Sequence, residues 1–228
     1  VDMRIHADVA DVMKDIAIQA QDAGNHREWL GWCRRVNAKY PAALPSYFQK
    51  QKPLNPYAFI QRFSECLEEG DPVICGNGSA CVITFQAMQI KKGQRLFTNS
   101  GCAAMGYGFP AALGCAVARQ GDRVICVDGD GSFQMNLQEL QTVVYNCLNL
   151  KIIILNNNGY HSIRQTQTNL FDPPLVGVCD GNGLSFPSLE KIACAYGIPY
   201  EKIDGLADIP GKMRKILQTE GPALCEVV

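Results

Sequence analysis

Two short polar motifs carry the chemistry that this sequence offers. A Gly-Asp-Gly-Ser motif occupies residues 129–132, and an Asn-Asn pair follows at residues 156–157. Mg²⁺ prefers oxygen ligands in an octahedral arrangement, and a diphosphate supplies some of them but adds negative charge. One carboxylate, one neutral amide and one backbone carbonyl complete such a ligand set, and Asp130, Asn157 and Gly159 can supply them in that order. The two motifs therefore predict a clamp for a metal ion and a diphosphate.

The apolar segments before these motifs are typical of buried strands. They span Val124–Val127 and Lys151–Leu155, and the helical spacing of apolar residues over 134–148 predicts one connecting helix. A strand–helix–strand crossover brings both motifs to the same edge of a parallel sheet. The glycines beside Asp130 let backbone amides approach phosphate oxygens, and Ser132 lies where we expect the helix to begin.

Longer stretches around the motifs resemble a known enzyme family. A Gly-Asp-Gly motif, a spacer of this length and a terminal Asn-Asn pair form the signature of thiamine diphosphate enzymes. Residues 99–112 (Asn-Ser-Gly-Cys-Ala-Ala-Met-Gly-Tyr-Gly-Phe-Pro-Ala-Ala) are similar to a stretch of acetolactate synthase large subunits, and so are residues 132–140. The resemblance runs from about Asn55 to the C-terminus and corresponds to the third, diphosphate-binding domain of that family. It implies thiamine diphosphate and Mg²⁺ as cofactors.

The resemblance also implies roles for individual residues. Met105 matches the apolar wedge that bends thiamine into a V shape, while the carbonyl of Ala103 and the amide of Met105 match the groups that hold its aminopyrimidine ring. The residues that we predict to bind the cofactor are Gly78, Ser79, Ala103, Met105, Gly129, Asp130, Gly131, Ser132, Asn157, Gly159 and Tyr160. The predicted metal ligands among them are Asp130, Asn157 and the carbonyl of Gly159. No catalytic residue is predicted in this chain, because the family's activating glutamate belongs to its first domain, which this sequence does not match.

Two departures from the family bear on the reaction. Acetolactate synthases carry Gln-His-Gln where this sequence has Ser79–Cys81, so we expect the Ser79 hydroxyl to replace part of the diphosphate contacts. They also carry a tryptophan, used in choosing the second substrate, at the position of Thr166. The resemblance thus implies a decarboxylase or carboligase that acts on a small 2-oxo acid, with acetolactate synthase as one member of that class. It further implies a homodimer or homotetramer for the full-length protein.

The order of predicted elements is that of a doubly wound α/β domain, with a parallel sheet flanked by helices, after a shorter leading segment. We interpret residues 1–50 as the end of a central domain with linker helices, and residues 51–228 as the diphosphate-binding domain. Helices are expected within 1–22, at 25–40, at Tyr57–Leu67, from Cys81 onward, and at 110–118, 187–196 and 208–218. Strands are expected within 1–22 and at Val73–Cys75, 95–98, 199–203 and 223–227. Ligands of open parallel sheets bind beyond the carboxyl ends of such strands.

Other interpretations of the motifs stay open. Residues 128–139 have the acidic spacing of a Ca²⁺-binding EF-hand loop, although Phe133 replaces the required glycine. Residues 106–111 match the glycine spacing of a Rossmann-type dinucleotide fingerprint, with Asp128 at a suitable distance. The Gly-Asp-Gly turn can also be purely structural. A further alternative is that the chain is a non-catalytic interaction fragment with a degenerate site.

Composition excludes several classes of function. A net charge of -1 argues against a nucleic-acid footprint, and 47% hydrophobic with 19% charged residues is typical of a soluble globular protein. No apolar run approaches the length of a membrane span and the start lacks a signal-peptide pattern, so we expect a cytoplasmic protein.

The cysteines, one histidine and one apolar cluster complete the sequence-based expectations. Eleven cysteines, an odd number without a Cys-x-x-Cys pair, are expected to be reduced. Those expected to be buried in apolar strands and helices are Cys75, Cys81, Cys102, Cys115, Cys126 and Cys147. We interpret His161 as a helix-surface residue, with a substrate-facing role as the alternative. Met105, Tyr107 and Phe109 are expected to expose apolar surface at the rim of the site.

Overall fold

The computed structural model describes residues 2–20, 24–49 and 52–228. The chain forms two compact units that divide after Pro41. The first unit contains α1 (Val9–Gln19) and α2 (Arg27–Lys39), and neither helix has a buried residue. The strand predicted within residues 1–22 is absent from the described part of that segment, where α1 is the one regular element. The predicted domain boundary between residues 50 and 51 falls outside the described residues.

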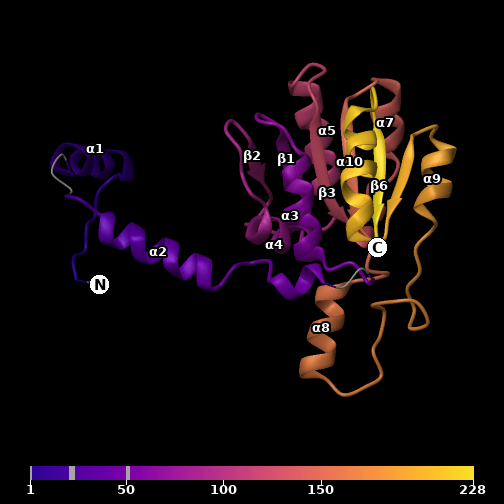
Figure 1. Ribbon diagram of the computed structural model, residues 1–228, viewed down its shortest axis with the longest axis horizontal. Helices are drawn as coiled ribbons and strands as arrows, with labels where there is room; N and C mark the ends of the chain where they lie inside the picture. The colour runs from indigo at the N-terminus through magenta and orange to yellow at the C-terminus, as the bar shows by residue number, and fades with distance from the viewer. Residues whose placement is uncertain (1, 21–23, 50–51) are drawn as a thin grey trace. The chain divides into compact units, whose positions relative to one another are not determined.

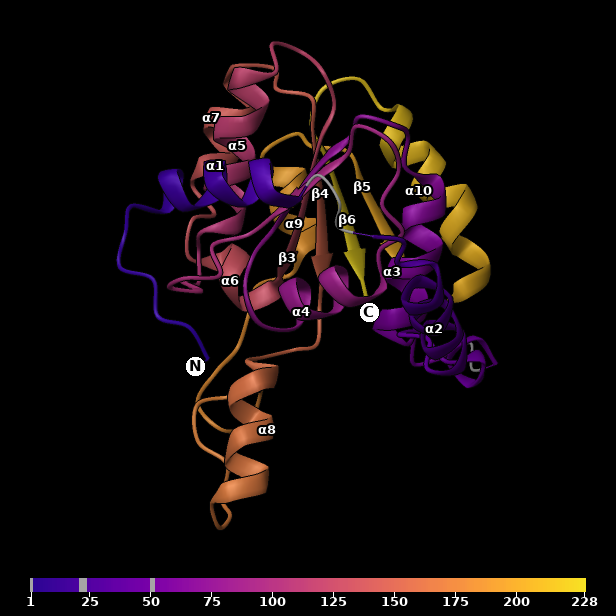
Figure 2. The same cartoon turned by 90° about the vertical axis from the view of Figure 1, so that its left-hand side faces the viewer.

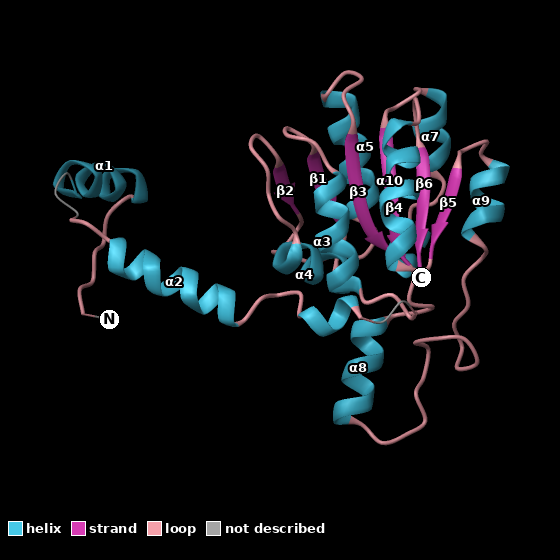
Figure 3. Cartoon of the chain, in the orientation of Figure 1, coloured by secondary structure: helices cyan, strands magenta, loops and turns pink. Residues whose placement is uncertain are grey.

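The second unit is built on a six-stranded parallel sheet (Figures 1 and 3). Its strands are β1 (Pro72–Cys75), β2 (Arg95–Phe97), β3 (Val124–Gly129), β4 (Leu150–Leu155), β5 (Tyr200–Ile203) and β6 (Ala223–Val227). The order in the sheet is β2-β1-β3-β4-β6-β5. Because β1 pairs with β2 on one side and with β3 on the other, the direction of winding reverses between β1 and β3. This confirms the predicted doubly wound α/β fold and defines the switch point where ligands bind in such sheets.

Helices cover both faces of the sheet (Figure 2). One face packs against α3 (Pro56–Cys66), α4 (Gly78–Ala87) and α10 (Ile209–Gln218). The other packs against α5 (Gly108–Ala118), α6 (Asp130–Gln134), α7 (Glu139–Tyr145) and α9 (Leu189–Ala195). The remaining helix, α8 (His161–Leu170), extends beyond the carboxyl edge of the strands, and short 3-10 turns occur at Pro45–Phe48 and Leu206–Asp208 (Figure 1). None of the helices in the described ranges is long and apolar enough to cross a membrane.

The crossover between β3 and β4 differs from the prediction. The single helix expected over 134–148 is wrong, because a turn separates α6 from α7. Asn136 lies in this turn and its Nδ2 donates to the carbonyl of Gly106 at 2.6 Å, which ties the turn to the loop before α5. Apolar periodicity alone does not reveal such a break, since both short helices present their apolar residues to the same core.

Three expectations about exposure are wrong. Phe109 is fully buried, with its ring packed edge-on against Phe133 at 5.0 Å, so it adds no apolar surface to the rim. Cys102 and Cys147 are exposed and lie in turns between regular elements.

Candidate cofactor site

A cavity of ≈160 Å³ opens at the carboxyl edge of the sheet, next to the switch point. The predicted cofactor residues that line it are Gly78, Ser79, Met105, Gly129, Asp130, Gly131, Ser132, Asn157, Gly159 and Tyr160. Ala103 does not line it; this residue is exposed and has a left-handed backbone with φ of 49°. The fold therefore gathers residues from the ends of β1, β3 and β4 and from the loop before α5, which are far apart in sequence.

Asp130 reaches the cavity because β3 passes directly into α6 without a loop. Its two carboxylate oxygens accept hydrogen bonds from different backbone segments, Oδ1 from Gly131 N–H at 2.9 Å and Oδ2 from Gly159 N–H at 3.0 Å. Burial raises the pKa of the Asp130 carboxyl, and these N–H groups act in the opposite direction. A cation held here would favour the ionised carboxylate, so the buried acid suits a metal ligand.

Asn157 offers the second oxygen. Its Oδ1 is buried and has no hydrogen-bond partner among the described residues. A buried carboxamide oxygen without a donor is costly in a folded protein, unless a ligand supplies the missing contact. The residue also lines the cavity together with Asp130, so this orphaned oxygen fits a Mg²⁺ ligand set.

The turn that follows β4 is fixed by close backbone packing. Gly159 forms an isolated bridge with Cys179, and a Cβ added to Gly159 would lie 2.1 Å from the carbonyl oxygen of Val178. A Cβ on Gly131 would likewise lie 2.3 Å from the ring of Tyr160. Glycine is therefore required at both positions by close approach, and the turns of β3 and β4 are held in direct contact.

Ser132 connects the same turn to the loop that carries Met105. Its hydroxyl accepts a hydrogen bond from Gly106 N–H at 2.9 Å, one residue after Met105. The carbonyl of Gly106 is held by Asn136, as described above. The half-buried Met105 thus lies beside the Gly-Asp-Gly turn because both backbone groups of its neighbour are anchored to α6 and the turn after it.

Asp128 is placed where it cannot reach a ligand. Its side chain is fully buried between Gly76 and Gly108; a Cβ on either glycine would come within 2.6 Å of its carboxyl oxygens. Burial raises the pKa of Asp128 to about 6. A dinucleotide-binding acid must contact the ribose, so this placement argues against the Rossmann-type alternative. The helix-packing role of Gly108, whose added Cβ would lie 2.6 Å from the Gly76 Cα, explains the glycine spacing instead.

The EF-hand alternative fails on geometry as well. Across the parts of the chain with assigned positions, no three His, Cys, Asp or Glu residues come together as a metal site. Glu139, the last ligand of such a loop, instead accepts a hydrogen bond from the Thr142 hydroxyl at 2.9 Å on α7.

Two helix N-termini also open onto the cavity. The first residues of α4 and of α8 line it, and the first N–H groups of a helix have no partner within the helix. Such N-termini favour anions, including the oxygens of a diphosphate. The lining residues that the sequence did not single out as cofactor ligands are Asn77, Ala80, Leu155, Ser162 and Ile163, together with His161. The exposed His161 both begins α8 and lines the cavity, so the structure accommodates both of its interpretations.

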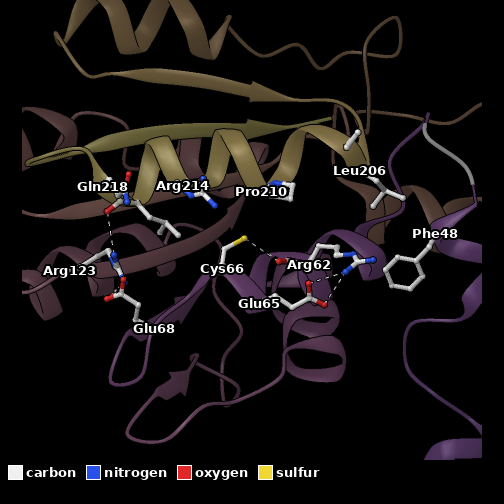
Figure 4. A pocket seen from close by; sticks show the side chains of 12 residues that line it. Phe48, Arg62, Glu65, Cys66, Glu68, Arg123, Leu206, Pro210, Arg214 and Gln218 are labelled. Atoms are coloured by element: carbon white, nitrogen blue, oxygen red, sulfur yellow. Dashed lines mark hydrogen bonds and ion pairs between the residues drawn. The ribbon is translucent and has the colours of Figure 1, made fainter.

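A larger cavity of ≈660 Å³ lies elsewhere, between α3 and α10 (Figure 4). Its charged side chains largely pair with one another, with Arg62 Nη1 3.0 Å from Glu65 and Arg123 Nη2 3.2 Å from Glu68. None of the residues lining it belongs to the two polar motifs, and the two that follow a strand end, Leu206 and Ala207, follow β5 at the edge of the sheet away from the switch point. Cavity volume therefore does not identify the cofactor site. The smaller cavity is the better candidate, because it is lined by Asn157 with its unpartnered amide oxygen, by the buried Asp130 and by two helix N-termini.

The fold and the site together define a doubly wound parallel α/β domain with a cavity at its switch point, lined by one buried carboxylate and two helix N-termini. Residues 76–227 match the family model of the thiamine pyrophosphate enzyme C-terminal TPP-binding domain, and the chain belongs to this family. Thiamine pyrophosphate and thiamine diphosphate are the same cofactor.

Curated relatives are similar over nearly the whole chain. The acetolactate synthase isozyme 1 large subunit of Escherichia coli strain K12 is 29% identical over 223 residues, which cover 98% of this chain and 38% of that protein. The acetolactate synthase large subunit of Cyanidium caldarium is 29% identical over 232 residues, which cover 99% of this chain and 38% of the relative. The chloroplastic acetolactate synthase of Arabidopsis thaliana is 30% identical over 205 residues, 86% of this chain and 30% of its own length. The chain thus spans less than two fifths of the length of these relatives.

Proposed function

We propose that this chain is the cofactor-binding part of a thiamine diphosphate- and Mg²⁺-dependent enzyme of 2-oxo acid metabolism. Such an enzyme removes CO₂ from a small 2-oxo acid and passes the remaining fragment to an aldehyde, a second 2-oxo acid or a proton. The similarity to acetolactate synthases supports carboligation of two 2-oxo acids. The observation that carries the proposal is the orphaned Oδ1 of Asn157 beside the buried Asp130 carboxylate.

The proposed contacts divide among the three strand ends. Asp130, Asn157 and the carbonyl of Gly159 would hold Mg²⁺, which suits one charged and two neutral oxygen ligands. The N-termini of α4 and α8 would face the diphosphate. The residues proposed to line the diphosphate are Gly78, Ser79, Gly129, Gly131, Ser132 and Tyr160.

The thiamine end of the cofactor would lie against the loop before α5. Met105 is half-buried in the cavity wall and is anchored through Gly106, so it can support a bent thiamine from below. We propose that the carbonyl of Ala103 and the amide of Met105 hold the aminopyrimidine ring. When bound, thiamine diphosphate stabilises the negative charge left after decarboxylation, and the protein supplies binding and orientation.

The proposal extends to the assembly. We propose that the full-length protein is a homo-oligomer in which the cofactor lies between subunits, as the acetolactate synthase resemblance implies. The half-buried Met105 and Tyr107 then face a second subunit across the cavity rim.

Calorimetric titration of the 228-residue chain separates the proposed function from its alternatives. We expect thiamine diphosphate to bind in the presence of Mg²⁺ and much more weakly in its absence, and NAD not to bind. Asn157→Ala should weaken Mg²⁺–thiamine diphosphate by about tenfold, because a neutral ligand is lost while the carboxylate stays. Equal binding with and without Mg²⁺ would overturn the metal assignment, and no binding of thiamine diphosphate would leave an interaction fragment with a degenerate site.

A further inference from the structure

The side chain of Asn156, the residue before the proposed metal ligand Asn157, is held at both ends. Its Nδ2 donates to Glu226 Oε1 at 2.6 Å, and its Oδ1 accepts from Asn158 N–H at 2.9 Å. Its own backbone N–H donates to the carbonyl of Val227 at 2.8 Å. Asn156 therefore closes the turn on one side and attaches it to the end of β6 on the other.

Glu226 is the centre of this attachment. It lies on β6, opposite Ile154 of β4 and Lys202 of β5, so it stands between the two neighbouring strands (Figure 3). Its side chain is buried, and the second carboxylate oxygen, Oε2, accepts from the hydroxyl of Tyr200. Burying an ionised carboxylate is costly unless it is well hydrogen-bonded. Here both oxygens have a donor, and one donor is the side chain that shapes the turn.

A carboxylate at this position also fixes which way the Asn156 amide faces. A carboxylate accepts hydrogen bonds and cannot donate them, so the amide nitrogen must face Glu226. The amide oxygen is then left to face the N–H of Asn158. The hydrogen bond from Asn158 N–H to the Asn156 side chain spans Asn157 and therefore fixes the backbone conformation of Asn157.

We propose that Glu226 is a positioning residue for the metal-binding turn, acting through Asn156 to keep the amide oxygen of Asn157 directed into the cavity. The inference rests on the proposed function, because it needs Asn157 to be a ligand of Mg²⁺. It assigns a role to a buried acid that lines none of the cofactor cavity and contacts none of the proposed ligands directly. Partners behind a metal ligand of this kind affect metal affinity by about 10- to 100-fold.

Reversing the hydrogen bond between the two side chains tests the proposal. Asn156→Asp sets two carboxylates against each other, and we expect Mg²⁺–thiamine diphosphate to bind the 228-residue chain about 10- to 100-fold more weakly. Adding Glu226→Gln to that variant restores one donor and one acceptor, and we expect affinity to return to within about threefold of the parent. Tyr200→Phe removes the other hydrogen bond to Glu226 and should cost only about two- to threefold, since Asn156 keeps its partner.

The matched control is Glu201→Gln on β5, which removes a partly buried carboxylate that pairs with Lys215 and does not touch the turn. Its affinity should match that of the parent. Affinity is measured by calorimetry, and the melting temperature of each cofactor-free variant is measured alongside. The positioning role is wrong if Asn156→Asp lowers the melting temperature and Glu226→Gln restores it while both variants bind Mg²⁺–thiamine diphosphate as tightly as the parent. It is also wrong if the double variant melts like the parent but still binds Mg²⁺–thiamine diphosphate weakly. If the parent itself binds no Mg²⁺–thiamine diphosphate, the proposed function fails and this inference fails with it.

Discussion

Strand β4 has a buried lysine at its amino end and the proposed metal turn beyond its carboxyl end, and the two ends differ in how their polar groups are satisfied. At the amino end, the fully buried Lys151 donates to the carbonyls of Thr219 and Gly221 at 2.5 and 2.6 Å. Arg123 forms a bidentate salt bridge with Asp71, in which Nε donates to Oδ1 at 3.0 Å and Nη2 donates to Oδ2 at 2.7 Å. Every charged group of this set has partners within the fold.

At the carboxyl end, by contrast, Oδ1 of Asn157 is buried without a partner among the described residues, and Asn157 lines the cofactor cavity. Oδ2 of Asp128 is also unpartnered, but it is enclosed between Gly76 and Gly108 and does not face the cavity. An unpartnered amide oxygen also occurs at the amino end, on Asn149, so the contrast rests on the cavity that Asn157 lines. Buried polar groups without partners in a native fold need an explanation, and an absent ligand is one of them. The comparison assigns stability to one edge of the sheet and binding to the other.

The first and largest expected effect is the absence of catalytic turnover by the isolated chain, because the cofactor cavity at the carboxyl edge of the sheet lacks an activating acid among the described residues. Asp130 is the one carboxylate among the residues that line the cofactor cavity, and both of its oxygens are held by backbone N–H groups. It therefore cannot act as the activating glutamate that the family takes from another domain. We expect the 228-residue chain with Mg²⁺ and thiamine diphosphate to consume no pyruvate above a cofactor-only blank.

Addition of a pyrimidine-binding domain from the same family should restore turnover, because it supplies the missing acid. Pyruvate consumption by the pure chain alone would show that this edge is a complete active site.

Asp130→Asn is expected to separate binding from stability at the carboxyl edge. Removing the one negative ligand should weaken Mg²⁺–thiamine diphosphate by about 100-fold, or about 2.7 kcal/mol. The free energy of unfolding of the cofactor-free chain should fall by about 1–2 kcal/mol, because the Asn amide keeps one oxygen to accept an N–H and leaves the other N–H without an acceptor. Calorimetry and urea unfolding measure the two quantities on the same sample. Unchanged affinity would mean that the clamp is assigned to the wrong residues.

Asp71→Asn makes the opposite test at the amino edge. The variant weakens the pair with Arg123 and should lower the free energy of unfolding by about 2 kcal/mol, as expected for a hydrogen bond between charged groups. Its affinity for Mg²⁺–thiamine diphosphate should stay within about twofold of the parent, since the two sites share no partner. A large loss of affinity in a folded variant would remove the division between the two edges.

Much of the binding edge could be predicted from the sequence, and the reasons are local. The strands before the Gly-Asp-Gly and Asn-Asn motifs are continuous apolar runs, and the crossover rule places their ends together. Those features identified Asp130 and Asn157 as candidate site residues, and the structure shows that both line the same cavity. Their roles as metal ligands remain predictions.

The parts that escaped prediction depend on contacts between distant segments. Glu226 follows Asn156 by many residues, and only the pairing of β4 with β6 brings them together. The break between α6 and α7 is stabilised by Asn136 bonding to Gly106, which no local pattern of apolar residues reveals. Phe109 lies in a glycine-rich stretch that suggested a rim, yet its ring packs in the core against Phe133. In each case a contact between segments distant in sequence determines the local structure, so the local sequence pattern does not predict it.

The smallest expected effect lies in the loop that would hold the aminopyrimidine ring. Ala103 has a left-handed backbone with φ of 49°, at a position where the resemblance to acetolactate synthases implies glycine, and a Cβ in this region costs about 1–2 kcal/mol. Ala103→Gly removes that strain but loosens the unfolded chain, which offsets part of the gain. We therefore expect the free energy of unfolding to rise by about 0.5–1 kcal/mol. Ala104→Gly is the control, because the adjacent alanine is not among the residues with positive φ and should lose stability instead. If both substitutions lower the free energy of unfolding in urea, the left-handed geometry at Ala103 carries no strain, and the departure from glycine is neutral for the fold.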